Sequence, residues 1–420
     1  MAIRIVPHDI SHQPAIQAFN ARLLAAGNLP FPVGEGGGTD AQSQAESSSS
    51  SPLQFHHFLA IDDEGAVRGA FFIRTQPFLI RGKVATVGHY TAPLSEGIID
   101  KRYAAVGPMM LACALRMQPL LFAMGMGGMD RPLPRMLKGM GWTVIETPFF
   151  FRILNAHRFL RNAGPLKATQ LRRLAATAAA FSGLGSLSIH AAQKFRTRAS
   201  PDAAQLRTEP LTGFGAWADE VWRCTAPLYS LSAVRDSRCL EQIYPESASR
   251  LHGLRIVGSE KGGWVQMLDC EPKQADYFGA MKVMALVDGL APEPAISPLV
   301  AAALNLGREK GADLVISNQM HHAWKDALLA NGFWQGPSNY LLALSKGLAA
   351  LLDPLPESIP RIHFNRGDGD GLVNLRGNAA VLSTPRSRPD RCGKPPGLTP
   401  SRSGSCASAS AAPGRSARRV

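Results

Sequence analysis

Three titratable side chains stand at the ends of apolar runs that we predict to be strands. His89 and Tyr90 end the run Lys83–Tyr90, and Asp288 follows the run Met281–Val287. An imidazole accepts a proton near neutral pH, and a phenol or a carboxyl group can exchange one, so these residues are candidates for general acid–base chemistry. Successive side chains of a strand point to opposite faces, so only one of His89 and Tyr90 faces any one cleft. The alternative for His89 is a satisfied hydrogen-bonding residue, the commoner role of a lone histidine at a strand end.

Two histidine pairs and one acidic loop raise the question of a metal. His56-His57 lies in a predicted strand, where neighbours point apart, and neither this pair nor His321-His322 has a carboxylate or cysteine at ligand spacing. The segment Arg366-Gly-Asp-Gly-Asp-Gly resembles a calcium loop, but the five residues that follow it end at Arg376, where such a loop needs a bidentate Glu. We therefore expect no metal and interpret this segment as a surface turn.

The elements that must position these residues occur twice along the chain. In the first part, the strand Lys83–Tyr90 is followed by a helix opening at Pro108, a strand over 119–125, a helix from Pro134 and a strand over 149–154. In the second part, the same order runs through a strand over 281–287, an amphipathic helix from Ile296, and three more elements over 314–317, 323–331 and 339–344. A predicted hairpin precedes each series, over 55–74 and over 251–268. The fold class is therefore α/β, with a unit of about 150 residues present twice.

The boundaries follow from composition. We predict a first domain over 1–157 with a low-complexity insert at 34–51, a basic, Ala-rich helical linker over 158–204, a second domain over 205–350, an extension over 351–379, and a disordered basic tail over 380–420. The domain over 1–157 is called the first half of the chain, and the domain over 205–350 is called the second half.

The net charge of +13 is unevenly placed. The tail and the linker hold most of the excess, while the rest of the chain is close to neutral, which argues against a dedicated nucleic-acid groove. Six cysteines without a CxxC spacing and a start without a signal-peptide pattern predict a cytoplasmic protein with reduced thiols. For the linker helix, we favour an interdomain connector over a membrane-surface helix, so we expect at most peripheral membrane contact.

Two segments carry a resemblance to a known superfamily. RYAAVG at 102–107 resembles the Arg/Gln-x-x-Gly/Ala-x-Gly/Ala phosphate loop of the GNAT acyl-CoA N-acyltransferases, with Arg102, Ala105 and Gly107 at the matching steps. SNQMHHAWKDALLANGF at 317–333 resembles the late strand and Gly-Phe-terminated helix of the same superfamily. The resemblance implies two mixed-sheet GNAT-like domains in tandem. It also implies that acetyl-CoA or another acyl-CoA is the acyl donor.

The resemblance implies roles for individual residues. Arg102, Ala105 and Gly107 would hold the pyrophosphate of the acyl-CoA, and Asn318 would hold its pantetheine arm, unless Asn318 is a helix cap. Proton transfer would fall to His89, Tyr90 and Asp288. The second half has no Arg-x-x-Gly-x-Gly equivalent before Ile296.

Four further segments resemble bacterial GNAT-like proteins linked to exopolysaccharide production. They are GMGG at 125–128, PFFFRIL at 148–154, QGPSNYLLALSK at 335–346 and HFNRGDGDG at 363–371. This resemblance implies an amine acceptor, either a small molecule or a glycan intermediate of the cell envelope. Two alternatives stay open: a Fem-type aminoacyl transferase, to which the tandem units are distantly similar, and a degenerate GNAT pair that acts as a binding or scaffold module.

Overall fold

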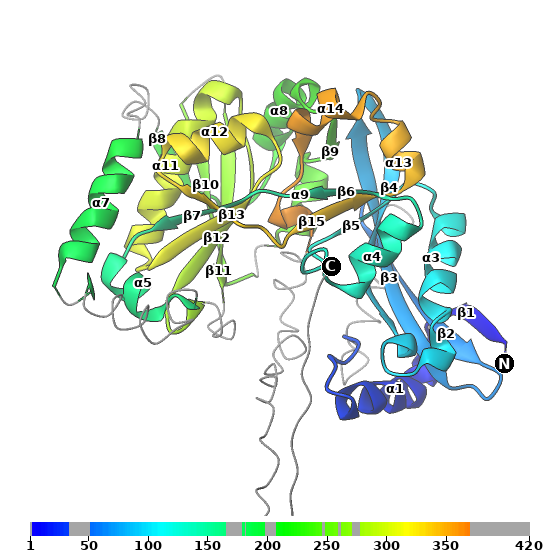
Figure 1. Ribbon diagram of the computed structural model, residues 1–420. Helices are drawn as coiled ribbons and strands as arrows, with labels where there is room; N and C mark the ends of the chain where they lie inside the picture. The colour runs from blue at the N-terminus through cyan, green and yellow to red at the C-terminus, as the bar shows by residue number, and fades with distance from the viewer. Residues whose placement is uncertain are drawn as a thin grey trace, which may run out of the picture. The chain divides into compact units, whose positions relative to one another are not determined.

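The computed structural model describes residues 2–32, 51–164, 179–180, 182–197, 207–245, 248–258, 262–270 and 278–369. These residues form two mixed β-sheets, here called sheet A and sheet B, with helices on the faces of both (Figure 1). The α/β class with two mixed sheets is therefore confirmed. Almost all of the predicted insert over 34–51 and the whole tail over 380–420 lie outside the described residues. Within the predicted linker, the described helices are the end of α5 (Ala156–Asn162) and α7 (Leu184–Arg196).

Sheet A is built on strands of the first half. Its strands are, in spatial order, β1 (Ile3–Pro7), β2 (Gln54–Asp62), β3 (Val67–Ile80), β4 (Lys83–Ser95), β5 (Leu121–Met124), β15 (Leu341–Leu344) and β6 (Thr143–Glu146), with β9 (Leu231–Ala233) beside β3 and β16 (Ile362–His363) beside β9. The hairpin predicted over 55–74 is β2–β3, with Phe58 opposite Phe71. β4 and β5 run parallel, and their neighbours within the path β1 to β6 are antiparallel.

Sheet B is built on strands of the second half. Its strands are, in spatial order, β14 (Trp334–Gly336), β7 (Phe149–Ile153), β13 (Leu314–Asn318), β12 (Val283–Leu290), β11 (Trp264–Cys270), β10 (Leu251–Val257) and β8 (Arg207–Pro210). The hairpin predicted over 251–268 is β10–β11, and β12 and β13 form the parallel pair.

Each half contributes an internal strand to the sheet of the other half, and the second half also adds β9 beside β3. β15 belongs to the second half but lies between β5 and β6 of sheet A, with Leu342 opposite both Met124 and Ile145. β7 belongs to the first half but lies between β13 and β14 of sheet B, with Phe151 opposite both Ile316 and Trp334. Each sheet therefore needs residues from both halves to complete its ladder.

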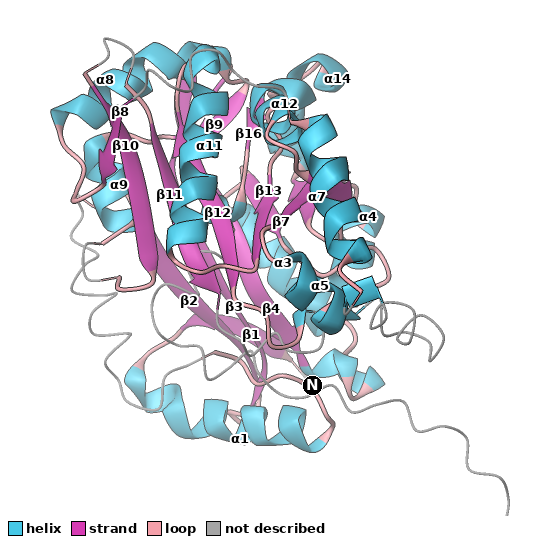
Figure 2. Cartoon of the chain, turned by 90° about the vertical axis from the view of Figure 1, so that its left-hand side faces the viewer, coloured by secondary structure: helices cyan, strands magenta, loops and turns pink. Residues whose placement is uncertain are grey.

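Alternation along the strands explains why each sheet carries structure on both faces. One face of sheet A packs on α3 (Val106–Met117) and α4 (Pro132–Gly139), and the other packs on α1 (Gln13–Ala25) near β2 and on α13 (Lys346–Ala350) and α14 (Leu355–Ser358). The short strands β9 and β16, which extend the sheet beside β3, share the core on this second face. In sheet B, α11 (Glu293–Glu309) and α12 (His322–Ala330) cover one face, and α8 (Ala216–Thr225), α9 (Ser237–Ile243) and α5 lie on the other. Figure 2 shows α11 lying along the strands of sheet B. The helices predicted to open at Pro108 and Ile296 begin at Val106 and Glu293.

Candidate functional site

The two parallel strands of sheet A, β4 and β5, are joined by only two residue pairs. Gly88 lies opposite Leu121 and His89 opposite Phe122, and β4 then continues to Ser95 along β3. A bulge, in which two residues of β4 oppose one residue of β3, bends the strand within this continuation, and Ala92 there has a φ of 47°. Residues 91–95 are half-buried. Crevices at the carboxyl ends of parallel strands are where open α/β sheets bind ligands, so this opening is our candidate site.

The end of β5 turns away through glycines. Gly125, Gly127 and Gly128 have φ values of 93°, 80° and 102°, in the left-handed region that residues with a Cβ rarely adopt. The GMGG segment therefore lets the chain leave sheet A directly after Met124, at the opening between β4 and β5.

The predicted phosphate loop lies at the exposed start of α3. Ala105 precedes the helix, no side chain caps it, and Ala105 is exposed while Gly107 is half-buried. A Cβ on Gly107 would meet only the Met136 Sδ, at 3.4 Å. Because Pro108 has no backbone N–H, the first turn offers an anion the N–H groups of Val106 and Gly107, and the helix dipole favours negative charge at this end.

Arg102 stands beside this helix start on a short 3-10 turn. Its side chain is 81% exposed, and its Nη2 lies 2.6 Å from the Asp100 Oδ2. Hydrogen bonds from Arg102 hold the pKa of Asp100 below its usual value. Arg102, Ala105 and Gly107 are thus brought together as the sequence predicts, with one acidic neighbour that would compete with a bound anion.

His89 and Tyr90 occupy opposite faces of sheet A. His89 is buried on the face that packs on β9 and β16, where its ring stacks on Phe122 with the centroids 4.5 Å apart. Its Nε2 has no hydrogen-bond partner among the described residues, and burial, together with the charge of Arg74, holds its pKa well below the ordinary value. The imidazole is therefore neutral at physiological pH.

Tyr90 lies in the core beneath α3. Its ring packs in the cluster that includes Phe71 and Leu111, and its hydroxyl has no partner among the described residues. Burial raises its pKa further above the ordinary value. His89 and Tyr90 therefore cannot act on the same reacting group from one side of the sheet.

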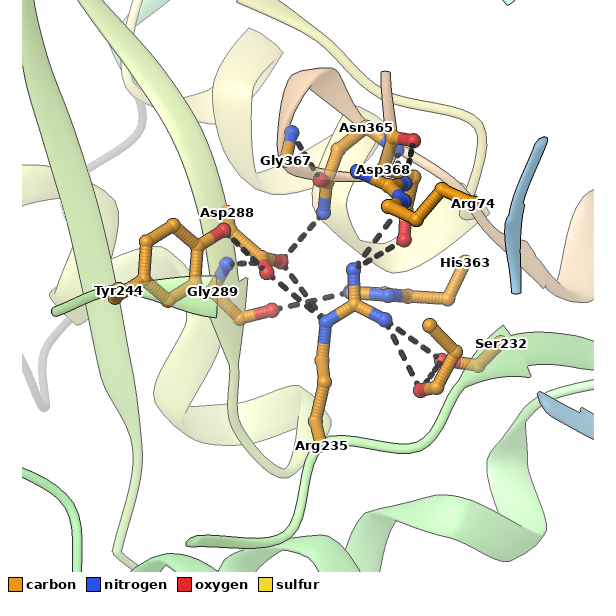
Figure 3. A network of polar contacts seen from close by, with 11 residues as sticks. Arg74, Ser232, Arg235, Tyr244, Asp288, Gly289, His363, Asn365, Gly367 and Asp368 are labelled. Carbon is orange, nitrogen blue, oxygen red and sulfur yellow. Dashed lines mark hydrogen bonds and ion pairs between the residues drawn. The ribbon is translucent and has the colours of Figure 1, made fainter. Parts of the chain in front are cut away.

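Asp288 lies at the centre of a buried polar network (Figure 3). Its carboxylate accepts hydrogen bonds from the Arg235 Nε at 3.0 Å, the Tyr244 hydroxyl at 2.8 Å and the Asn365 Nδ2 at 2.7 Å. The backbone N–H of Gly289 donates a fourth bond at 2.8 Å. Both carboxylate oxygens are therefore occupied.

Arg235 joins Asp288 to a second carboxylate. It follows β9, is 1% exposed, and donates from Nη2 to both oxygens of Asp368, at 2.9 and 3.0 Å. Its Nη1 donates to the Ser232 hydroxyl and the Ala233 carbonyl. Burial and the neighbouring Asp288 raise the pKa of Asp368 to about 6 despite the attraction of Arg235. One buried cation therefore serves two carboxylates.

The segment around Asp368 is not the surface turn that the sequence suggested. Residues 362–369 are buried except for Arg366, and the main-chain carbonyl of Asp368 accepts a hydrogen bond from the Arg74 Nη2 of β3, at 2.6 Å. The expectation was wrong because it weighed only the calcium-loop pattern. It did not weigh the need of a buried arginine elsewhere in the chain for carboxylate partners.

This C-terminal segment, residues 362–369, fills the strand opening of sheet B. The ladder of β12 and β13 ends at the pair Leu286–Ser317, and beyond it Asn365 forms a β-bridge with Gln319. The Arg366 Nε donates to the Asn318 Oδ1 at 2.9 Å, while the Asn318 Nδ2 lies 3.3 Å from the carbonyl of Pro148. Asn318, predicted to bind the cofactor, therefore ties this segment to the crossover before β7.

The sequence did not reveal Arg235, Tyr244, Asn365, Asp368 or Arg74 as members of one cluster. The available signal was Asp288 itself, because a charged residue at the end of an apolar strand needs a partner. Which of the many arginines supplies it depends on contacts between residues far apart in the chain.

Within the part of the chain that the structure describes, no group of three or more His, Cys, Asp or Glu side chains is arranged to hold a metal ion. In the same residues, no helix has both the length and the apolar character that crossing a bilayer requires.

The chain matches no protein-family model and no curated protein. It is similar to a GCN5-related N-acetyltransferase from Anabaena variabilis, at 9% identity and a TM-score of 0.48, over 81% of this chain and 72% of that one. It is also similar to a probable N-acyltransferase from Enterococcus faecalis, at 10% identity and a TM-score of 0.44, over 82% of this chain and 72% of that one. A third similar structure is Saccharomyces cerevisiae N-myristoyltransferase with bound myristoyl-CoA, at 10% identity and a TM-score of 0.44, over 81% of this chain and 82% of that one.

Proposed function

We propose that this chain transfers an acyl group from an acyl-CoA to an amine, at the opening between β4 and β5. The observation that carries this proposal is the early end of the β4–β5 ladder beside the uncapped start of α3. An acyl-CoA has an extended arm with two amides and a pyrophosphate at its far end. The unpaired strand edges beyond the ladder suit the first, because an extended ligand can add hydrogen bonds to a free edge. The helix start suits the second.

The residues of the phosphate loop would contact the pyrophosphate in two ways, through the backbone and through a side chain. Ala105 and Gly107 let the backbone approach the anion closely. Arg102, three residues before Ala105, would supply a charge-assisted contact to the anion when its side chain exchanges Asp100 for the pyrophosphate. The thioester carbon would then be carried by the arm toward His89, at the last residue pair of the ladder.

The reaction forms a C–N bond and breaks a C–S bond. The attacking amine loses one proton and the leaving thiolate gains one, so a base and an acid are needed. We propose that the neutral His89 imidazole accepts the proton that the attacking amine loses and then returns it to the leaving thiolate, so that one group acts first as base and then as acid. The packing of Tyr90 and the filled hydrogen-bond capacity of Asp288 favour supporting roles for these two residues. We propose an acceptor among the amine-bearing sugars or intermediates of exopolysaccharide or envelope assembly.

A second candidate function is a binding module without turnover. The buried Tyr90 hydroxyl and the occupied Asp288 carboxylate are the observations that favour it, because both leave the opening without an obvious second proton-transfer group. This candidate shares the acyl-CoA site but not the reaction.

Calorimetry with CoA and a panel of acyl-CoA thioesters tests the proposal. Charge-assisted contacts contribute roughly 1.5 to 3 kcal/mol, so Arg102→Ala should weaken binding about ten- to a hundredfold. The matched control is Arg223→Ala, which removes another exposed arginine paired with a nearby acid, Glu220, on α8. Equal affinities for the two variants, or no binding by the wild type, would remove the basis of the proposal. Binding without transfer to any amine would instead favour the binding module.

A further inference from the structure

The outer face of α7 exposes large apolar side chains. Phe195 is 91% exposed, Leu187 68% and Leu184 66%. With Ala191, which is also exposed, these residues recur at steps of 3, 7 and 11 from Leu184, so they form one stripe along the helix.

The opposite face of α7 packs on the rest of the chain. Gln193 is buried, Ile189 contacts the core beside sheet B, and Gly185 lies against Leu160 of α5. Figure 1 shows α7 at the edge of the part that contains sheet B, near α5 and α11. The apolar stripe is therefore on a helix held in place from one side, not on a loose segment.

The surroundings of the stripe are basic. Lys194 and Arg196 of α7 are exposed, as are Arg161 and Arg158 of α5, the last of which also pairs with Asp313. From Ala156 to Pro201 the sequence has eight Lys and Arg residues and no Asp or Glu. An exposed apolar stripe with basic flanks on a helix is the pattern of an interfacial helix, which lies in the headgroup region with its apolar face toward the acyl chains.

We propose that α7 docks this protein on an anionic lipid surface. Anionic headgroups complement the basic flanks, and each basic residue near such a surface strengthens association about fivefold. Leu184, Leu187 and Phe195 would enter the acyl boundary. A nucleic acid would satisfy the charges but leave the apolar stripe in water, and a second copy would bring two strongly basic faces together. This inference does not depend on the acyl-transfer proposal.

Co-sedimentation of the full chain with vesicles tests it. Vesicles of phosphatidylcholine with phosphatidylglycerol should bind the wild type, and vesicles of phosphatidylcholine alone should bind it at least tenfold less. The double variant Leu187→Ser with Phe195→Ser should bind the anionic vesicles at least tenfold less than the wild type. The control, Ile10→Ser with Val84→Ser, removes apolar side chains that are 67% and 65% exposed elsewhere and should bind as the wild type does.

Hydrogen exchange separates α7 from the other basic parts of the chain. Peptides covering Leu184–Arg196 should gain protection when anionic vesicles are added, and the melting temperature of the α7 variant should match that of the wild type because both side chains are exposed. Lack of binding by the wild type would overturn the proposal. So would undiminished binding by the α7 variant, or a dimer that this variant converts to a monomer.

Discussion

Both sheets contain a parallel strand pair whose ladder stops early, and in both the strand that leads into the long helix carries a bulge: β4 near Ala92 and β12 at Val287. In sheet A, ten residues separate β4 from α3, and the opening is bordered by half-buried residues. In sheet B, only two residues separate β12 from α11, and residues 362–369 fill the opening. The opening of sheet B is thus closed by another segment of the chain, whereas half-buried residues border the opening of sheet A.

Charge explains the difference. A carboxylate such as Asp288, buried at the end of β12, is strongly destabilising unless it is paired, and Arg235, Tyr244 and Asn365 provide its partners. The corresponding end of β4 also carries a buried carboxylate, Glu96, but Arg22 of α1 and Arg68 of β3 pair with it, so no segment from the far end of the chain is needed there. We infer that the second opening contributes to stability while the first is the one suited to a ligand.

The largest effect should follow from separating the halves. Residues 1–157 alone lack β15, and residues 205–350 alone lack β7, so each sheet would lose an internal strand. We expect neither fragment to fold, as measured by circular dichroism and tryptophan fluorescence. A cooperative unfolding transition in either fragment would contradict the view that the exchange joins the two halves.

The next effect concerns the opening of sheet B, which residues 362–369 fill. Arg235→Met leaves Asp288 and Asp368 buried without their cation, and breaking a buried pair in this way costs about 3 to 5 kcal/mol of unfolding free energy. Urea denaturation should show this loss. Adding Asp288→Asn and Asp368→Asn to the same variant should recover a large part of it, because the uncompensated charges are then gone. A variant as stable as the wild type would show that the network is not what holds the C-terminal segment.

Substitutions at the opening of sheet A should change the affinity for acyl-CoA and leave the stability of the protein unchanged. Gly107→Val places a branched side chain where the backbone must approach a phosphate, and we expect acyl-CoA binding to weaken by more than the ten- to a hundredfold expected for Arg102→Ala. Asn318→Ala, which changes the closed opening, should lower the melting temperature and leave acyl-CoA affinity unchanged. The opposite outcome, with affinity lost only in Asn318→Ala, would move the site to sheet B.

Acid should destabilise the protein partly through His321. Burial lowers its pKa to about 3, whereas an unfolded histidine has an ordinary value near 6.5, so between these values the unfolded state binds the extra proton. Stability is therefore present above pH 6.5 and falls as the pH drops, by about 1.4 kcal/mol per unit for this one group. His321→Phe keeps a ring against Tyr229 and should flatten the dependence between pH 6.5 and 5. Urea midpoints of both proteins at each pH provide the measurement, and equal slopes would exclude His321 as a source.

The smallest effect should come from the acid beside the phosphate loop. Asp100→Asn removes a carboxylate that holds Arg102 and would repel a bound anion, so acyl-CoA affinity should rise about two- to fivefold at low salt. The gain should shrink as salt increases, because exposed charges are screened. Weaker binding in this variant would indicate that Asp100 positions Arg102 instead of competing for it.

Local patterns predicted the α/β class and most elements, because apolar periodicity and Pro or Gly at helix ends act over short stretches. The hairpins β2–β3 and β10–β11 were found in this way. The strands β7 and β15 were also expected near their observed positions, but nothing in their sequences indicates which sheet they join. Both are apolar and would fit the interior of either sheet.

Only part of the candidate site and of the buried network could likewise be predicted from the sequence. Arg102, Ala105 and Gly107 are contiguous in sequence, so a motif can bring them together. Arg235, Asp288 and Asp368 come from three distant segments, and a single sequence carries no signal that pairs them. His89 and Tyr90 show the limit of spacing alone, since alternation separates their faces but does not say which face is lined by a ligand.

The exchanged strands also bear on the order in which the protein forms during synthesis. Sheet A begins with Ile3, yet the strand between β5 and β6 ends at Leu344, so a ribosome must complete nearly all of both halves before this sheet can close. Until then the edges of β5 and β6 are open to pairing with other nascent chains. Most domains can fold as they emerge, N-terminal part first. Sheet A must instead wait for the end of the second half, so its central edge stays unpaired through most of synthesis.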